Sequence, residues 1–192
     1  MADINDPLSE SLDTKRRTSA SAQNRGLRRS DAALLAYAEL LFFAYRDFTR
    51  DPDAILKDFG FGRAHHRVLH FVTRHSGLRV ADLLDVLKIT KQSLGRVLKQ
   101  LIDKGHIVQR AGSADRRERL LYPTAAGRAL TKRLAAPQLI RLTEALKSAG
   151  PGAEAVVRRF LQAMINAEER PKVSSIMSTS PAPEGDGNAE AT

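Results

Sequence analysis

Two short stretches of the sequence concentrate side chains that can bind a polyanion. The first, "RAGSADRRERLLYP" (residues 110–123), places three closely spaced arginines behind a small and flexible Gly-Ser-Ala turn. The second, "TKQSLGRVLKQLIDKG" (residues 90–105), mixes cationic and amide side chains with leucine and valine at helical spacing. Arginine and lysine bind phosphate, and arginine and glutamine also read base edges through paired hydrogen bonds. Both stretches therefore predict a surface that contacts nucleic acid.

The positive charge of the chain is gathered in one segment. The 192 residues carry a formal net charge of +9. Residues 63–133 hold 16 Lys and Arg against 5 Asp and Glu, whereas the rest of the chain holds 15 against 17. Charge clustered in this way favours a polyanionic partner, with nucleic acid ahead of an anionic lipid surface.

Several classes of protein are disfavoured by what the sequence lacks. It contains no cysteine, which excludes a disulfide framework and thiolate metal sites. The longest apolar stretch covers only residues 33–45, shorter than the roughly 20 residues of a membrane span, and the first residues do not resemble a signal peptide. There is no glycine-rich phosphate loop and no Ser-His-Asp arrangement. We therefore expect a cytoplasmic protein that is not an enzyme, needs no cofactor and has no membrane partner.

The periodicity of apolar residues predicts the elements that must position the two stretches. Helices are expected over residues 30–50, 63–75, 79–89, 91–105, 124–148 and 151–168, with another starting at Asp51-Pro52 and strands at 106–110 and 118–122. The polar composition of residues 1–29 and 169–192 predicts two disordered tails around an ordered domain at 30–168. The expected fold class is mainly α with a small β-hairpin (α+β).

Two short helices, a tight turn, a longer helix and a hairpin form a winged helix-turn-helix pattern, in which the longer helix enters the DNA major groove. In residues 90–104 the apolar positions share one face, and Gln92, Arg96 and Lys99 lie opposite them. The DNA-binding side chains predicted for this helix are Thr90, Lys91, Gln92, Ser93, Arg96 and Lys99. Those predicted for the hairpin, the wing (residues 111–118), are Arg116, Arg117 and Arg119, which suit a narrow minor groove. Asp115 is expected to brace the wing by pairing with a nearby arginine.

The run from "FGRAHHRVLHFV" through "ITKQSLGRVLKQLIDKG" to "DRRERLLYPTAAGRAL" resembles the MarR family of bacterial transcriptional regulators, most closely its PetP-type branch. The resemblance implies a homodimer on a pseudo-palindromic DNA site, with dimerisation helices at 30–59 and 124–168 and a DNA-binding winged helix at 62–123. It implies that Arg117 is the minor-groove residue at the wing tip. It also places Lys91, Gln92, Ser93 and Arg96 at base-reading positions.

Two glycines depart from the pattern of the family. Gly62 stands where many members have a Ser or Thr helix cap. Gly95 replaces a usual Ser or Thr within the recognition helix, at a cost of about 1 kcal/mol of helix propensity relative to alanine.

The aromatic and histidine residues allow more than one interpretation. Seven of the ten aromatic residues lie within residues 42–71, as expected for core and dimer packing or for a pocket that binds a small aromatic or apolar effector. The residues predicted for such a pocket are Phe42, Tyr45, Phe48, Phe61, His66 and His70. The i, i+4 spacing of His66 and His70 also leaves open a metal-responsive regulator, although no metal site is expected by default. A winged-helix module that binds protein rather than DNA is the remaining alternative.

Overall fold

The computed structural model describes residues 7–113 and 115–178, with side chains from residue 31 onward. Its helices are α1 (Pro7–Lys57), α2 (Arg63–Arg74), α3 (Val80–Leu87), α4 (Lys91–Asp103), α5 (Ala125–Ser148), α6 (Ala153–Met164) and α7 (Arg170–Ser178). Its strands are β1 (Leu78–Arg79), β2 (Ile107–Ala111) and β3 (Arg119–Pro123), in the antiparallel order β1-β3-β2. The predicted fold class, mainly α with a small β-hairpin, is confirmed. Among the described helices, none combines the length and apolar character needed to cross a membrane.

The chain divides into two compact units, the first ending at Asp47 and the second beginning at Phe48. In the first unit, the described part of α1 exposes many large apolar side chains, including those of Leu34, Leu35, Tyr37, Leu40, Phe42, Phe43 and Tyr45. The second unit contains the end of α1 and all the other elements, and it has the continuous buried core.

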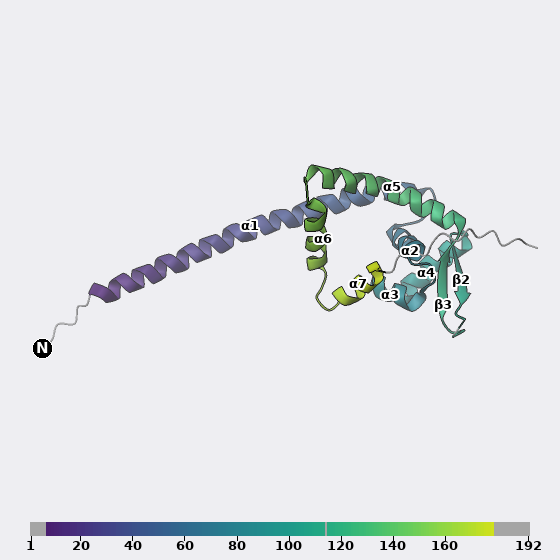
Figure 1. Cartoon of the computed structure of the whole chain (residues 1–192), viewed down its shortest axis with the longest axis horizontal. Helices are drawn as coiled ribbons and strands as arrows, with labels where there is room; N and C mark the ends of the chain where they lie inside the picture. Colours follow the sequence, from purple (N-terminus) through teal and green to yellow (C-terminus); the bar gives the residue numbers. More distant parts are fainter. Residues whose placement is uncertain (1–6, 114, 179–192) are drawn as a thin grey trace, which may run out of the picture. The chain divides into compact units, whose positions relative to one another are not determined.

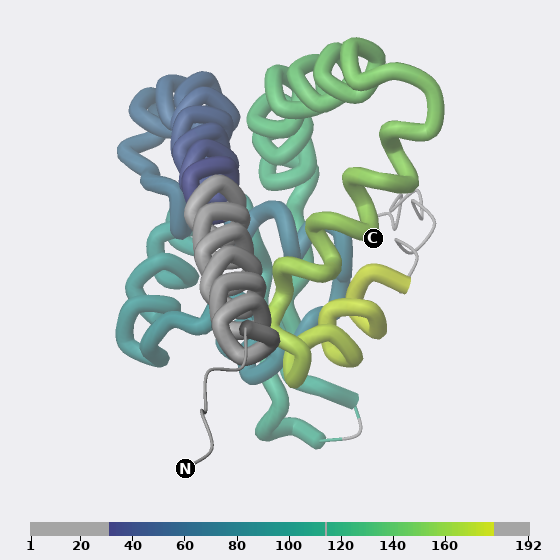
Figure 2. The backbone as a smooth tube through the Cα atoms, turned by 90° about the vertical axis from the view of Figure 1, so that its left-hand side faces the viewer, coloured from purple at the N-terminus to yellow at the C-terminus, as the bar shows by residue number. Residues whose placement is uncertain are grey.

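The core of the second unit is built from one face of each short helix. Helix α4 contributes Leu94, Val97, Leu98 and Leu101, and α2 contributes Val68, Leu69 and Val72. Leu121, at the middle of the sheet, is fully buried against them. The hairpin formed by β2 and β3 extends away from these helices (Figure 1 and Figure 2). The apolar stripe of α4 therefore fixes the rotation of that helix, while the tip of the hairpin stays outside the core.

The sheet has one strand more than the sequence predicts. β1 pairs with the outer side of β3, joining Leu78 to Leu121 and Arg79 to Leu120. A two-residue strand is too short to show the alternation of apolar and polar residues from which a strand is predicted. It is recognised only by its pairing with β3. Strand β3 also extends one residue beyond the predicted end at residue 122, because its last residue, Pro123, lies opposite Ile107.

The helix break expected at Asp51-Pro52 is wrong, because α1 continues through Pro52 to Lys57. Proline lacks the N–H that would reach the carbonyl four residues earlier, here that of Phe48. Nε2 of Gln138, on α5, donates to that carbonyl at 3.3 Å. Arg141 of α5 also pairs with Asp51 at 3.3 Å. A partner 90 positions away thus replaces the missing hydrogen bond, which no local pattern could reveal.

The structure places helix in both segments that were predicted as disordered tails, at residues 7–29 and 170–178. Residues 7–29 form the first part of α1, since they include one glycine and no proline after Pro7 and can extend the apolar helix that follows. Residues 170–178 form α7, which lies beside α3 (Figure 1) and is held there by Lys172–Asp85 and Lys88–Glu169 ion pairs. Residues 1–6 and 179–192 lie outside the described part of the chain.

A close contact joins α5 to the start of the hairpin. The Thr124 hydroxyl accepts the Gly127 N–H at 3.0 Å and donates to the Gly105 carbonyl at 2.6 Å. The Thr124 N–H also donates to the His106 carbonyl at 3.1 Å. A Cβ atom on Gly127 would lie 2.0 Å from that same carbonyl oxygen. Glycine is therefore required at this position by backbone packing.

We expect Gly127→Ala to lower the Tm, because the new methyl group forces two backbones apart at a cost of about 1–3 kcal/mol, more than the helix propensity gained. Gly95→Ala is the matched control, since its Cβ would meet no atom within 4 Å, and it should raise the Tm. Thermal unfolding followed by circular dichroism measures both variants. Equal shifts in the two variants would contradict the packing argument.

Candidate nucleic-acid interface

Helix α4 presents its polar face to solvent because its apolar face is buried. Lys91, Gln92, Arg96 and Lys99 are exposed, as are residues 95 and 100 on the same helix. Among the described residues, the side chains of Lys91, Gln92 and Arg96 have no hydrogen-bond or ion-pair partner. Lys99 pairs with Asp103 at 2.6 Å. Three of the predicted DNA-binding side chains thus stand free on one helix.

Two other predicted side chains on α4 are used within the helix cap. The Thr90 hydroxyl accepts the Ser93 N–H at 3.2 Å and donates to the Ser93 hydroxyl at 2.9 Å. This arrangement satisfies an amide at the helix start, as Thr at an N-cap commonly does. Thr90 and Ser93 therefore define the beginning of α4. Either residue can contact a ligand only through the hydrogen bonds that its hydroxyl can still form.

A histidine links α4 to the helix behind it. Nδ1 of His65 accepts the Gly62 N–H at 3.0 Å, so Nε2 carries the proton and donates to Oε1 of Gln100 at 2.5 Å. The His65 ring also stacks on Phe61, with centroids 4.6 Å apart. His65 thus supplies the cap that Gly62 cannot provide to α2, and it positions the C-terminal half of α4.

The tip of the wing is shaped by backbone hydrogen bonds. Oδ1 of Asp115 accepts the Arg117 N–H at 2.8 Å, and the Asp115 carbonyl accepts the Glu118 N–H at 3.0 Å. Asp115 thus pairs with a nearby arginine, Arg117, through the backbone N–H of that residue and not through its guanidinium group. A short Asp side chain closes a turn more readily through an amide two residues ahead.

The arginines of the wing remain available to a ligand. Arg116, Arg117 and Arg119 are exposed, and in the described ranges none of their guanidinium groups forms an ion pair. The hairpin carries them beyond the body of the second unit (Figure 2). Unpaired guanidinium groups on a projecting hairpin have the form needed to enter a narrow groove of negative potential.

A network that the sequence analysis missed ties the wing to α3. Arg79 donates to both carboxylate oxygens of Asp82, at 2.7 and 2.8 Å, and to Oε1 of Glu118 at 3.0 Å. The hydrogen bonds to Asp82 and then to Glu118 raise the pKa of the Arg79 guanidinium. Glu118 lies 39 positions from Arg79, and only the pairing of β1 with β3 brings the two together. Arg79 therefore braces the base of the wing and is not free to bind DNA.

The residues predicted to line an effector pocket differ in burial and in the unit to which they belong. Phe61 was expected there but is only 8% exposed, because it belongs to the core. Phe42 and Tyr45 are exposed on the first unit, whereas Phe48, His66 and His70 belong to the second unit and are half-buried. A sequence with clustered aromatics cannot distinguish a core ring from a ring that lines a pocket.

The two histidines considered as a metal pair, His66 and His70, both have a lowered pKa. Burial lowers the pKa of His66, and it lowers the pKa of His70 to about 4, helped by Arg74 and the neighbouring histidines. Within the described ranges, no group of three or more His, Cys, Asp or Glu side chains could hold a metal ion. His66 and His70 thus form a neutral pair without a third ligand in this part of the chain.

Comparison with known proteins identifies the family. A sequence model of the MarR family matches residues 59–118. The HTH-type transcriptional regulator PetP from Rhodobacter capsulatus is 47% identical over 137 residues, covering 71% of this chain and 82% of PetP. The chain belongs to the MarR family. Both the predicted family and its PetP-type branch are confirmed.

Solved MarR-type structures share the fold at low sequence identity. A mutant MarR from E. coli complexed with operator DNA superposes with a TM-score of 0.54 and 20% identity, covering 70% of this chain and 96% of the other. The MarR family regulator SP03579 superposes with a TM-score of 0.58 and 18% identity, covering 82% and 99%. A SlyA-like regulator from Listeria monocytogenes superposes with a TM-score of 0.52 and 19% identity, covering 72% of this chain and 88% of the other. These similarities support the winged-helix architecture of this MarR family member.

The brace formed by Arg79 can be tested by replacing Glu118 with the uncharged glutamine of the same shape. Removing a negative charge beside a DNA-binding surface should, by charge alone, strengthen binding. If the brace positions the wing, Glu118→Gln should instead weaken affinity by about threefold to tenfold. Fluorescence anisotropy with a duplex selected by the parent protein from a random pool, the selected duplex, measures the effect.

The control for this prediction is Glu154→Gln on α6, which breaks an ion pair with Arg158 away from the wing. Its affinity for the selected duplex should equal that of the parent. Tighter binding by Glu118→Gln would contradict the role of the Arg79 network.

Proposed function

We propose that this protein is a sequence-specific DNA-binding transcriptional regulator that acts as a homodimer. The observation that carries the proposal is the pairing of helix α4, on which Lys91, Gln92 and Arg96 have no partner among the described residues, with a hairpin on which Arg116 and Arg117 form no ion pair there. Membership of the MarR family supports it. So does the concentration of positive charge within residues 63–133.

The two elements have different tasks in this proposal. Gln92 and Arg96 on α4 read base edges in the major groove, where glutamine suits adenine and arginine suits guanine. Lys91, Thr90 and Lys99 contact phosphate at its margin. Arg117, assisted by Arg116 and Arg119, enters the adjacent minor groove. In a two-fold symmetric dimer, the centres of the half-sites would lie about 10 base pairs apart.

The exposed apolar side chains support self-association. Helix α6 contains no buried residue, yet Val156, Phe160 and Met164 follow one face at i, i+4 and i+8, each more than half exposed. The first unit separately exposes Leu34, Phe42 and other apolar residues of α1. Exposed apolar stripes of this extent mark interaction surfaces. A second copy of the chain is the partner we propose for them.

A small aromatic or apolar effector is a further part of the proposal. Phe48, His66 and His70 are the candidates to contact it on the second unit, with Phe61 in the core of that unit. Phe42 and Tyr45 are separate candidates on the first unit. Such a ligand changes DNA affinity only if it binds one arrangement of the dimer more tightly than another.

We expect alanine substitutions in the two elements to have different signatures. Arg117→Ala should weaken binding to every duplex by a similar factor and flatten the dependence of affinity on salt, whereas Arg96→Ala should relax preference at defined base pairs. Affinities for the selected duplex and single-base variants of it, measured between 50 and about 200 mM salt, separate the two cases. If both variants behave like the parent, the assignment to grooves is wrong. Parent affinity that does not change with salt would favour a protein-interaction module.

The homodimer is tested on α6 by Phe160→Asp. A carboxylate in an apolar interface is costly, so this variant should sediment as a monomer and lose affinity for a two-half-site duplex. Gln162→Asp, on the polar face of the same helix, should remain dimeric. Sedimentation equilibrium gives the mass of each variant, and a dimeric Phe160→Asp protein would reject this interface.

A further inference from the structure

Gly95 has no structural reason within the chain to be glycine. It lies in the middle of α4, is exposed, and a Cβ atom there would meet nothing within 4 Å. Its φ is not in the left-handed region that favours glycine. Glycine inside a helix lowers helix stability relative to alanine. Gly127 shows what this chain does with a helical glycine, because there it admits a neighbouring backbone.

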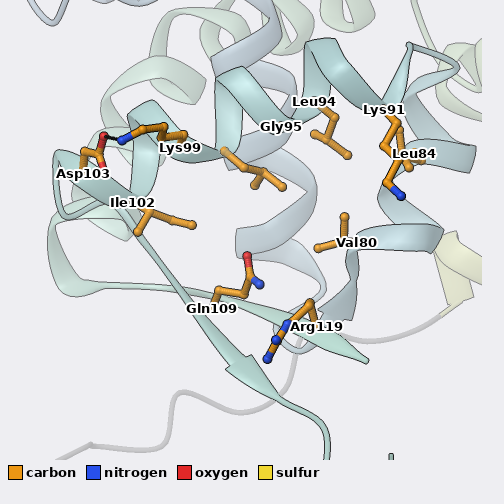
Figure 3. A pocket seen from close by; sticks show the side chains of 11 residues that line it. Val80, Leu84, Lys91, Leu94, Gly95, Lys99, Ile102, Asp103, Gln109 and Arg119 are labelled. Atoms are coloured by element: carbon orange, nitrogen blue, oxygen red, sulfur yellow. Dashed lines mark hydrogen bonds and ion pairs between the residues drawn. The ribbon is translucent and has the colours of Figure 1, made fainter. Parts of the chain in front are cut away.

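Gly95 opens onto a groove between α4 and the strands of the hairpin. The groove has a volume of about 440 Å³. Figure 3 shows Lys91, Gly95 and Lys99 along α4 on one side and Gln109 and Arg119 from the hairpin on the other. Its remaining lining is mainly apolar, contributed by Val80, Leu84, Leu94, Leu98 and Ile102. An apolar floor beneath cationic side chains is complementary to a sugar–phosphate strand, with deoxyribose inward and phosphate toward the edge.

The position of the groove specifies this occupant. In duplex DNA, a major groove and the neighbouring minor groove are separated by one sugar–phosphate strand. If α4 occupies the major groove and the wing occupies the minor groove, that strand must cross between them. The groove beside Gly95 is the space that the structure leaves there.

We propose that this groove seats the DNA strand between the two grooves, and that Gly95 is glycine so that the strand can approach the backbone of α4. The inference rests on the proposed function and deepens it. Lys91, whose side chain has no partner in the described part of the chain, binds a phosphate that flanks the seated sugar. Arg119 lines the opposite side of the groove, from which it extends toward the minor groove. The Lys99–Asp103 ion pair neutralises the carboxylate that borders the groove. Gly95 thereby contributes affinity without reading any base.

The test compares Gly95→Ala with the parent on the selected duplex and on a scrambled duplex of the same length. Gly95→Ala should unfold at the same or a higher temperature than the parent. Its affinity should fall by about tenfold or more on both duplexes, with an unchanged ranking of single-base variants, because a strand contact carries no sequence information. The matched control is Gly62→Ala, whose Cβ also meets nothing within 4 Å and which lies at the start of α2; it should bind like the parent.

A second measurement locates the strand on the duplex. Neutral methylphosphonates are placed one at a time along the selected duplex, and parent and Lys91→Gln affinities are compared. At the phosphate that lies in the groove, a methylphosphonate should weaken DNA binding by the parent. It should not weaken binding by Lys91→Gln any further, because that variant has already lost the contact with this phosphate.

The outcomes distinguish this inference from the proposal beneath it. Parent binding together with unimpaired binding by Gly95→Ala would overturn the groove alone. A loss confined to one base pair would also overturn it, because Gly95 would then face a base. Failure of the parent to select any duplex would reject the proposed function itself.

Discussion

The burial of one face of α4 is the constraint on which the candidate interface depends. Leu94 and Leu101 are almost completely inaccessible, and Val97 and Leu98 lie beside them. A helix anchored at four such positions cannot rotate about its axis without exposing apolar area. The directions of Gln92 and Arg96 are consequently settled by leucine and valine, and not by the polar residues themselves. The ring of His65 adds a polar restraint at the far end of the helix.

Residues of the same type take different roles according to where carboxylates lie. Arg79 faces two acids and is used inside the molecule, whereas Arg116 and Arg117 stand where no acid reaches them in the described chain. The acids of this region thus sort the basic side chains into those that shape the protein and those available to a partner. A count of charge over residues 63–133 treats all of these basic residues alike. Only the contacts separate them.

The sequence predicted what is local and missed what joins distant segments. The stripe of α4 and the Gly-Ser turn of the wing are short-range patterns, so the helix and the hairpin could be placed in advance. The continuity of α1 through Pro52 depends on Gln138, and the brace of the wing depends on Glu118, and neither partner is near in sequence. Phe61 was assigned to a pocket because aromatic residues suit both cores and ligands. The free side chains of α4 and the wing were named from the sequence, but their roles toward DNA remain predictions.

The joint at Thr124 has a mechanical consequence. One hydroxyl holds both the first turn of α5 and the loop before β2, and Gly127 keeps the two backbones in contact. No flexible linker separates the long helix from the hairpin. We therefore expect helix α5 and the hairpin to move together about residues 105–106. A tilt of α5 then displaces the arginine-bearing tip instead of being absorbed between the two elements.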